Sequence, residues 1–166
     1  MATKRSSSRA PRKAPAKAPA KAKAPTRRPV RNADLRRLLL AALAARQRAY
    51  APYSRYQVGA AVLGDDGRVY AGCNVENSSY GVCLCAERNA VGQAIARGAR
   101  RILAAAVVTS STPPAPPCGI CLQTFAELAD SDLPILLANP GDEERRLTLA
   151  ELLPHGFGPA ALKAAR

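Results

Sequence analysis

Aromatic residues and long apolar runs are both scarce in this chain of 166 residues. Tryptophan is absent and aromatic residues amount to 4%, while apolar residues reach 48%, so the core is expected to be aliphatic. A chain of this length can bury one such core. No apolar run is long or uninterrupted enough for a membrane span or for the apolar part of a secretory signal, and polar and basic residues follow Met1 directly.

Acidic residues are missing from the first 33 positions. This segment holds five Lys and six Arg, which is +11 of the net charge of +13, and Lys, Ala and Pro repeat within it. Regular proline prevents a long helix and like charges repel each other, so residues 1–33 are expected to be a disordered tail. Three interpretations are open: non-specific contact with nucleic acid, a solubilising extension, or an organelle transit peptide, against which the prolines argue.

Disulfide bonds are not expected, because the five cysteines are an odd number in a chain without a secretory signal. A reducing, cytoplasmic setting fits better, and clustered cysteines there more often bind metal or take part in chemistry. The cysteines are Cys73, Cys83, Cys85, Cys118 and Cys121.

Residues 34–166 are nearly neutral and are expected to form one ordered domain that begins at Asp34. Apolar residues at helical spacing predict a first helix over residues 34–50, with Asn32 or Asp34 as its cap. Strands are expected on both sides of a hairpin turn at residues 64–67. The alternation of strands and helices predicts a central sheet covered by helices. The expected strands are 57–63, 68–74, 102–109 and 133–138, and the later helices are 85–97, 118–128 and 150–153, followed by an apolar and basic helical end.

Two cysteine clusters carry the strongest chemical signal. Cys118 and Cys121 have the spacing of metal ligands, at a junction between a loop and a helix. Cys85 supplies a third thiol at the start of another helix, where free N–H groups favour a thiolate. Glu87 lies two positions further, so it can share a pocket with Cys85 only if both sit in the first helical turn.

Three thiolate ligands leave the fourth position of a zinc ion open, as catalytic zinc sites do. A water in that position can lose a proton near neutral pH, and a free carboxylate such as Glu87 is a suitable general base. From spacing alone, two other interpretations stay open. Cys83 can complete a closed structural site of four cysteines, or the thiols can be buried without a metal. Cys73 falls within an expected strand and is interpreted as a core residue.

Several short motifs accompany these clusters in a fixed order: Tyr53-Ser54-Arg55-Tyr56-Gln57-Val58-Gly59-Ala60-Ala61, Gly72-Cys73-Asn74-Val75-Glu76-Asn77-Ser78-Ser79-Tyr80-Gly81, Cys85-Ala86-Glu87-Arg88, Pro117-Cys118-Gly119-Ile120-Cys121-Leu122-Gln123, Glu151-Leu152-Leu153-Pro154 and Phe157-Gly158-Pro159. In these motifs and their spacing, about residues 34–160 resemble the cytidine deaminases, of the small type whose zinc is held by three cysteines.

The resemblance implies an α/β fold, a three-layer α/β/α sandwich with a central mixed sheet, and a homotetramer with one Zn²⁺ per subunit. It implies that Cys85, Cys118 and Cys121 are the zinc ligands. Glu87 is the implied proton shuttle, and zinc-bound hydroxide is the implied nucleophile at C4 of cytosine. Arg88 matches an arginine that hydrogen-bonds the ligand sulfurs and offsets their charge, although the helix pattern alone allows a solvated residue there.

Substrate contacts follow from the same resemblance. Asn74 and Glu76 match a ribose-binding pair, and two positions apart on a strand they face one side; without the family they are a polar pair at a sheet edge. Ala86 matches the backbone N–H that meets the pyrimidine carbonyl, and Tyr56 matches a pocket residue that is usually Phe. Phe157 matches an aromatic residue lent to a neighbouring subunit's pocket, and it equally fits a core position.

The chain departs from the family pattern at a few positions. Leu122 replaces the arginine that usually follows the last zinc ligand, which bears on substrate preference or on an interface contact. Cys83 stands where threonine is common. His155, the single histidine, falls at no ligand position, which excludes the version of the site with one histidine and two cysteines.

These features predict hydrolytic deamination of cytidine and 2′-deoxycytidine to uridine and 2′-deoxyuridine in pyrimidine salvage. The nearest alternative is a deaminase of a nucleoside-like antibiotic of the blasticidin S type, against which the retained Asn74 and Glu76 argue. Two further alternatives give the tail the leading part: a nucleic-acid-associated protein with a structural zinc domain, and a deaminase of polynucleotides. A compact nucleoside pocket argues against the last.

Overall fold

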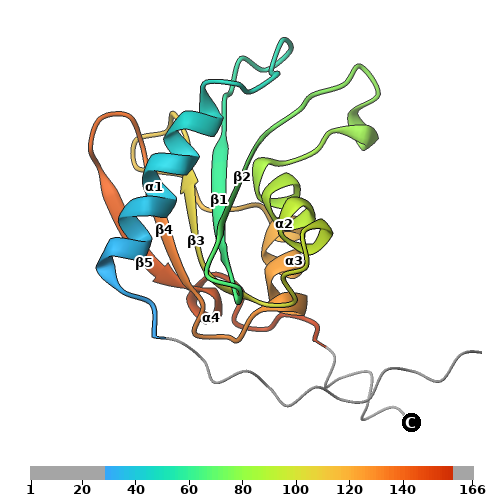
Figure 1. Cartoon of the computed structure of the whole chain (residues 1–166). Helices are drawn as coiled ribbons and strands as arrows, with labels where there is room; N and C mark the ends of the chain where they lie inside the picture. The colour runs from blue at the N-terminus through green and yellow to red at the C-terminus, as the bar shows by residue number, and fades with distance from the viewer. Residues whose placement is uncertain (1–28, 159–166) are drawn as a thin grey trace, which may run out of the picture.

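The computed structural model of the chain describes residues 29–158, and its centre is a five-stranded sheet (Figure 1). The strands lie in the order β2-β1-β3-β4-β5. β3 and β4 are parallel and the other neighbours are antiparallel, so the sheet is mixed, as expected. The strands are β1 (Gly59–Gly64), β2 (Val69–Cys73), β3 (Ile102–Val108), β4 (Pro134–Ala138) and β5 (Glu144–Thr148).

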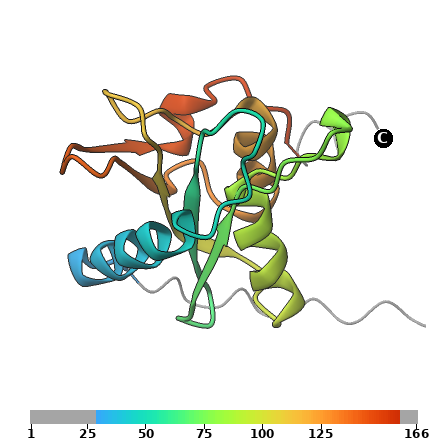
Figure 2. The same ribbon diagram turned by 90° about the horizontal axis from the view of Figure 1, so that it is seen from above.

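Helices cover both faces of this sheet. α1 (Asn32–Arg46) lies on one face, and α2 (Ala86–Ala96) and α3 (Gly119–Leu128) lie on the other, as the view from above shows (Figure 2). A short helix α4 (Leu149–Leu152) follows β5, and a 3-10 turn η1 (Tyr80–Val82) interrupts the long connection between β2 and α2. The predicted three-layer α/β/α sandwich is confirmed.

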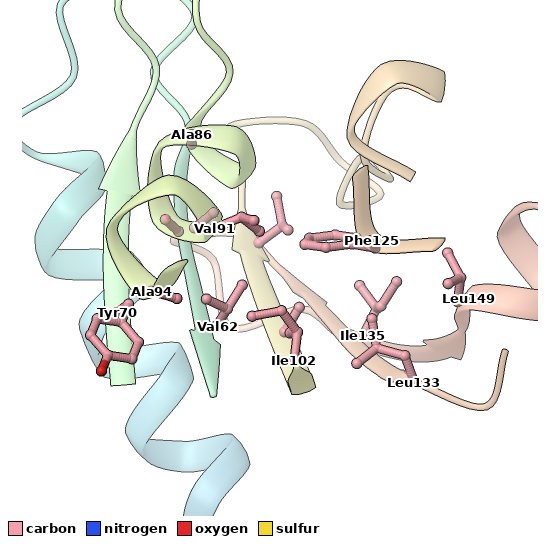
Figure 3. Close-up of a cluster of buried hydrophobic side chains, with 14 of the residues drawn as sticks. Val62, Tyr70, Ala86, Val91, Ala94, Ile102, Phe125, Leu133, Ile135 and Leu149 are labelled. Atoms are coloured by element: carbon pink, nitrogen blue, oxygen red, sulfur yellow. The ribbon is translucent and has the colours of Figure 1, made fainter. Parts of the chain in front are cut away.

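The core consists of two apolar clusters, one on each side of the sheet. Because both faces are covered, β1 and β3 are buried along their whole length. Successive residues of a strand point to opposite faces, so Val62 joins the cluster under α2 and α3, and Leu63 joins the cluster under α1. Figure 3 shows the first cluster, which includes Phe125 of α3 and Ile135 of β4. Apart from Tyr70 and Phe125, the buried residues of both clusters are aliphatic, as the composition predicts.

Close backbone contact fixes the position of α2 on the sheet. A Cβ atom added to Gly72 of β2 would lie 2.6 Å from the backbone N of Ala90 and 2.7 Å from the backbone O of Ala86. Glycine therefore lets the helix approach this strand more closely than any other residue could. The Asn89 amide adds a hydrogen bond of 2.8 Å to the backbone O of Cys73. β2 thus holds the first turns of α2, which carry part of the candidate site.

The first helix begins and ends earlier than predicted. The predicted caps, Asn32 and Asp34, are both inside α1, and Arg31 is the capping residue. Asp34 occupies the third helical position, where its carboxylate accepts a hydrogen bond of 3.1 Å from the backbone N–H of Arg31. Order therefore begins before Asp34. At the other end, α1 stops at Arg46, several residues before the predicted end near Tyr50.

The last strand of the sheet was missed by the sequence analysis, which expected only a short helix near that point. β5 is an edge strand whose first three residues, Glu144, Arg145 and Arg146, are exposed. A charged, exposed edge strand lacks the apolar alternation by which strands are recognised. The predicted helical end falls largely on residues 159–166, outside the described part of the chain. Within residues 29–158, no helix is long and apolar enough to cross a membrane.

Candidate metal centre and pocket

Three cysteines at the starts of two helices lie close together in space. Cys85 caps α2, Cys118 caps α3, and Cys121 lies in the first turn of α3. The Cys118 sulfur is 3.9 Å from that of Cys85 and 3.6 Å from that of Cys121, and all three sulfurs lie within 4.8 Å of one another. The expected ligand set is therefore brought together. Free N–H groups and the helix dipole at both starts favour thiolates there.

The other two cysteines lie outside this cluster. The Cys83 sulfur contacts the backbone of Asn77, accepting a hydrogen bond of 3.3 Å from its N–H. The thiol of Cys73 donates to the backbone O of Arg48 at 3.4 Å. The geometry thus favours a site of three thiols, open on one side, over a closed site of four.

Positive charge beside the cluster compensates its thiolates. The Arg88 guanidinium donates at 2.8 Å to the backbone O of Cys83 and lies 3.9 Å from the Cys85 sulfur. Hydrogen bonding from Cys121, and after it from Arg88, lowers the pKa of Cys85 to about 5. Hydrogen bonding to Cys85, and after it burial, raises the pKa of Cys121.

One Zn²⁺ ion fits this donor set. Thiolates at helix starts are soft, anionic ligands of the kind that zinc prefers. Metal binding displaces thiol protons, and the lowered pKa of Cys85 favours the thiolate that a metal ion requires. The buried Nε of Arg88 has no partner among the described residues, which leaves a donor for a ligand sulfur. The three cysteines therefore confirm the prediction of a zinc site.

Glu87 lies buried next to the cluster, in the first turn of α2, and is 4% exposed. Its pKa is raised above the ordinary value, first by burial and further by the negative charge of Cys85. A raised pKa brings a carboxylate towards the range in which it can both accept and donate a proton near neutral pH.

A pocket of about 460 Å³ opens in front of the metal centre. The starts of α2 and α3 form one end, the end of β2 and the segment before β1 form the other, and β3 with its following loop forms a wall. The lining residues are Ser54, Tyr56, Val58, Asn74, Glu76, Cys85, Ala86, Glu87, Val107, Thr109, Ala115, Pro116 and Cys118. All predicted site residues except Cys121, Arg88 and Phe157 are among them.

Asn74 lines the pocket and also holds the segment before β1. Its amide oxygen accepts a hydrogen bond of 2.8 Å from the Val58 N–H, and its amide nitrogen donates one of 2.9 Å to the backbone O of Tyr56. Each side of the amide keeps capacity for one more partner. Asn74 can therefore position Tyr56 and still face a ligand.

Glu76 holds an earlier part of the same segment. Its carboxylate accepts hydrogen bonds from the backbone N–H groups of Tyr53 at 2.9 Å and Ser54 at 3.2 Å, and from the Ser54 hydroxyl. These bonds lower the pKa of Glu76, and the bond from the Ser54 hydroxyl is the largest cause. They therefore favour the anionic form of the carboxylate. No role was predicted for Ser54 from the sequence, although it stands in one of the motifs.

Two of the singled-out residues lie away from the pocket of their own chain. Phe157 is 59% exposed, and its backbone O accepts a hydrogen bond of 2.5 Å from the Gln123 amide. Leu122 is buried in the apolar cluster under α3. The substitution of Leu122 for the usual arginine therefore adds an apolar residue to the core and leaves the pocket lining unchanged.

The wall of the pocket was not foreseen. Val107 lies in β3, Thr109 directly follows it, and Ala115 and Pro116 belong to the loop after β3. These are small or apolar residues with no chemical signature. For Ala115 and Pro116 the one available signal was their place shortly before Cys118, because a loop that ends at a ligand must pass the site.

The fold and the metal centre together define a zinc enzyme in which a three-cysteine site and a buried carboxylate lie at one end of a pocket. Residues 32–137 match the family described as "Cytidine and deoxycytidylate deaminase zinc-binding region". The chain belongs to this family, as its motifs predicted, and is a zinc-dependent hydrolytic deaminase.

Individual relatives agree with this placement. The cytidine deaminase of Halalkalibacterium halodurans is 47% identical over 124 residues, which cover 75% of this chain and 94% of the relative. The crystal structure of cytidine deaminase from Burkholderia pseudomallei is similar at a TM-score of 0.70 and 47% identity, over 74% of this chain and 98% of that one. The corresponding crystal structure from Mycobacterium tuberculosis has a TM-score of 0.66 and 46% identity, over 75% and 98%.

Proposed function

We propose that this chain converts cytidine and 2′-deoxycytidine to uridine and 2′-deoxyuridine by hydrolysis, releasing ammonia, in pyrimidine salvage. One observation carries the proposal: a three-thiol metal centre and the buried Glu87 face a pocket whose far end presents Asn74 and Glu76. The two ends suit the two halves of a nucleoside, a base that reacts and a sugar that is held.

At the reacting end, the zinc ion supplies Lewis-acid activation of water when it is bound. Glu87 accepts a proton from the attacking water and delivers it to N3 of the cytosine ring. A second proton transfer through Glu87 lets the C4 amine leave as ammonia, so that water is consumed and the C4 carbonyl of uridine forms. The raised pKa of Glu87, which burial causes first, supports this exchange in both directions.

The pyrimidine is oriented by the start of α2. The backbone N–H of Ala86 belongs to the first helical turn, where N–H groups have no helical partner, and Ala86 lines the pocket. This N–H donates to the C2 carbonyl of the base. The ribose hydroxyls are bound by Asn74 and Glu76, and Tyr56 covers the ring from the segment that those two residues hold.

We also propose that the enzyme is a homotetramer in which Phe157 closes a neighbouring subunit's pocket. Large apolar side chains are exposed near the pocket and on the segment between β2 and α2, a pattern that marks interfaces. They include Tyr50, Tyr53, Val75, Tyr80, Val82, Leu84, Ile120 and Phe157. Sedimentation velocity of the purified protein tests the assembly, and a monomeric, fully active enzyme would refute it.

The division of the chain is part of the proposal. Of the predicted tail, residues 1–33, residues 1–28 lie outside the described part of the chain, and α1 already begins at Asn32. The basic segment before residue 29 contacts nucleic acid non-specifically or keeps the protein in solution, in the cytoplasm. Removing residues 1–28 is expected to preserve activity and to abolish salt-sensitive binding to DNA. If the full-length protein binds no DNA at low salt, the solubilising function remains.

The decisive experiment is an ultraviolet assay of the zinc-loaded protein with cytidine, 2′-deoxycytidine and blasticidin S. Turnover of the two nucleosides is expected. Turnover of blasticidin S alone would favour the antibiotic deaminase. No turnover of any of the three, together with four sulfur ligands by X-ray absorption spectroscopy, would favour a structural zinc domain.

A further inference from the structure

A buried polar network lies behind the pocket wall, away from the metal centre. Its hub is Asn139, which directly follows β4 and is 7% exposed. The side-chain oxygen of Asn139 accepts hydrogen bonds from the backbone N–H groups of Gly141 at 2.9 Å and Glu143 at 3.2 Å, which shape the turn into β5. A buried amide with this many partners rigidifies what it joins.

The amide nitrogen of Asn139 reaches across to the loop at residues 110–117. It donates to the backbone O of Ser111 at 3.1 Å and to the Thr112 hydroxyl at 3.3 Å, and it also faces the Glu143 carboxylate at 3.1 Å. β4 thereby holds the loop that follows its parallel neighbour β3. The loop residues that line the pocket, Ala115 and Pro116, come shortly after this attachment.

Two contacts carry the attachment to the pocket. The Ser111 hydroxyl lies 2.5 Å from the phenol oxygen of Tyr56, which lines the pocket. Further along the loop, the backbone N–H of Ala115 donates at 3.1 Å to the hydroxyl of Thr109, which is itself part of the wall. The loop is thus connected near its start to Tyr56 and Asn139, and near its end to Thr109, which directly follows β3.

We propose that Asn139 is a positioning residue for nucleoside binding: it sets the loop at residues 110–117, and through Ser111 the Tyr56 ring, at the distance that the substrate requires. This rests on the proposed function of the pocket. The side-chain hydrogen bonds of Asn139 go to the loop and the turn and not to the lining residues. Asn139 therefore acts on the affinity for substrate, while the metal ligands and Glu87 keep their places on α2 and α3.

The chemistry of the position requires an amide. Asn139 uses its oxygen as an acceptor towards the turn and its nitrogen as a donor towards the loop, and only an amide combines both in one plane. An aspartate has the same shape and keeps the acceptor side. It loses the donor side, and it places a negative oxygen against the backbone O of Ser111 and the Glu143 carboxylate.

The test compares steady-state kinetics of the zinc-loaded enzyme and its variants with cytidine. For Asn139→Asp we expect KM to rise about tenfold, with kcat within about threefold of the parent and zinc content unchanged, because one or two loop hydrogen bonds are lost. A merely structural defect would lower the active fraction, and hence kcat, without moving KM. Ser111→Ala should raise KM by about threefold. Because both residues act through the same loop, KM of the double variant should rise by less than the product of the two single effects.

The matched control is Glu143→Ala, which removes one partner of the Asn139 nitrogen and leaves the loop contacts in place. Its KM should stay within about twofold of the parent. A parent-like KM in Asn139→Asp, or in Ser111→Ala where Asn139→Asp does not fold, overturns the proposal. An inactive parent enzyme would instead refute the proposed function, so the two failures can be told apart.

Discussion

A single methyl group added at Gly72 should displace the catalytic helix. In Gly72→Ala the new Cβ would lie 2.6 Å from the backbone N of Ala90 and 2.7 Å from the backbone O of Ala86, whereas ordinary contact begins at 3.4 Å. Both neighbours are backbone of α2, so the helix itself must move, by about 0.8 Å if the strand stays in place. Cys85 and Glu87 stand at the start of that helix and move with it.

The size of the effect follows from this displacement. A shift of the reacting groups by about 1 Å can cost roughly a hundredfold in rate, so kcat/KM for cytidine should fall by about one to two orders of magnitude. Overpacking of this kind costs about 1–3 kcal/mol, which lowers the melting temperature by roughly 2–12 °C. Zinc content should fall as well, since one of the three ligands leaves its place.

The chain supplies a matched control on the same helix. Gly92 is exposed, and a Cβ added there meets nothing within 4 Å. Gly92→Ala adds the same methyl group and removes backbone freedom in a helix, so it should raise stability by about 0.5–1 kcal/mol and leave kcat/KM unchanged. If Gly72→Ala matches Gly92→Ala in rate and melting temperature, the argument that close contact with β2 positions the site is wrong.

Three further predictions rest on other contacts. The Glu87→Gln variant should keep its zinc, and its kcat in the ultraviolet assay should fall by a factor of about 10² to 10⁴. Substantial residual turnover would show that Glu87 is not on the proton path. Removal of zinc with a chelator should abolish turnover and lower the melting temperature, because the ion binds only the folded state, and added zinc should restore both. The Tyr70 hydroxyl, 2.5 Å from the Asp66 carboxylate, is the main cause that lowers the pKa of Asp66 below its ordinary 3.8. This stabilisation is complete above pH 3.8 and is lost as the pH falls through the lowered value, so Tyr70→Phe should flatten the acid decline in melting temperature. An unchanged acid profile would contradict that assignment.

Much of the site could be read from local patterns. Cys118 and Cys121 stand at the spacing of metal ligands, and Cys85 with Glu87 requires the first turn of a helix. The structure has both features, with Cys85 and Cys118 as helix caps. Patterns of this kind concern neighbours in the chain, whose geometry is set by a few backbone angles.

Other features could not be read in this way. β5 was missed because it begins with the exposed residues Glu144, Arg145 and Arg146, and its pairing with β4 decides its conformation. The cap of α1 was misplaced because Asp34 acts from the third helical position, where its carboxylate accepts a hydrogen bond from the backbone N–H of Arg31. For β5, pairing with a strand distant in sequence outweighs a weak local preference.

The sequence by itself determined the family, the order of the elements other than β5, the ligand types and the carboxylate beside them, because these depend on residue identity and short spacing. Only the tertiary structure decided that the sulfurs of Cys85 and Cys121 lie within 4.8 Å of each other, that Glu87 is buried and its pKa raised, and that Asn139 hydrogen-bonds to the loop after β3. These depend on distances between segments far apart in the chain. Such distances are set by the packing of α2 and α3 on the sheet, down to the missing side chain of Gly72.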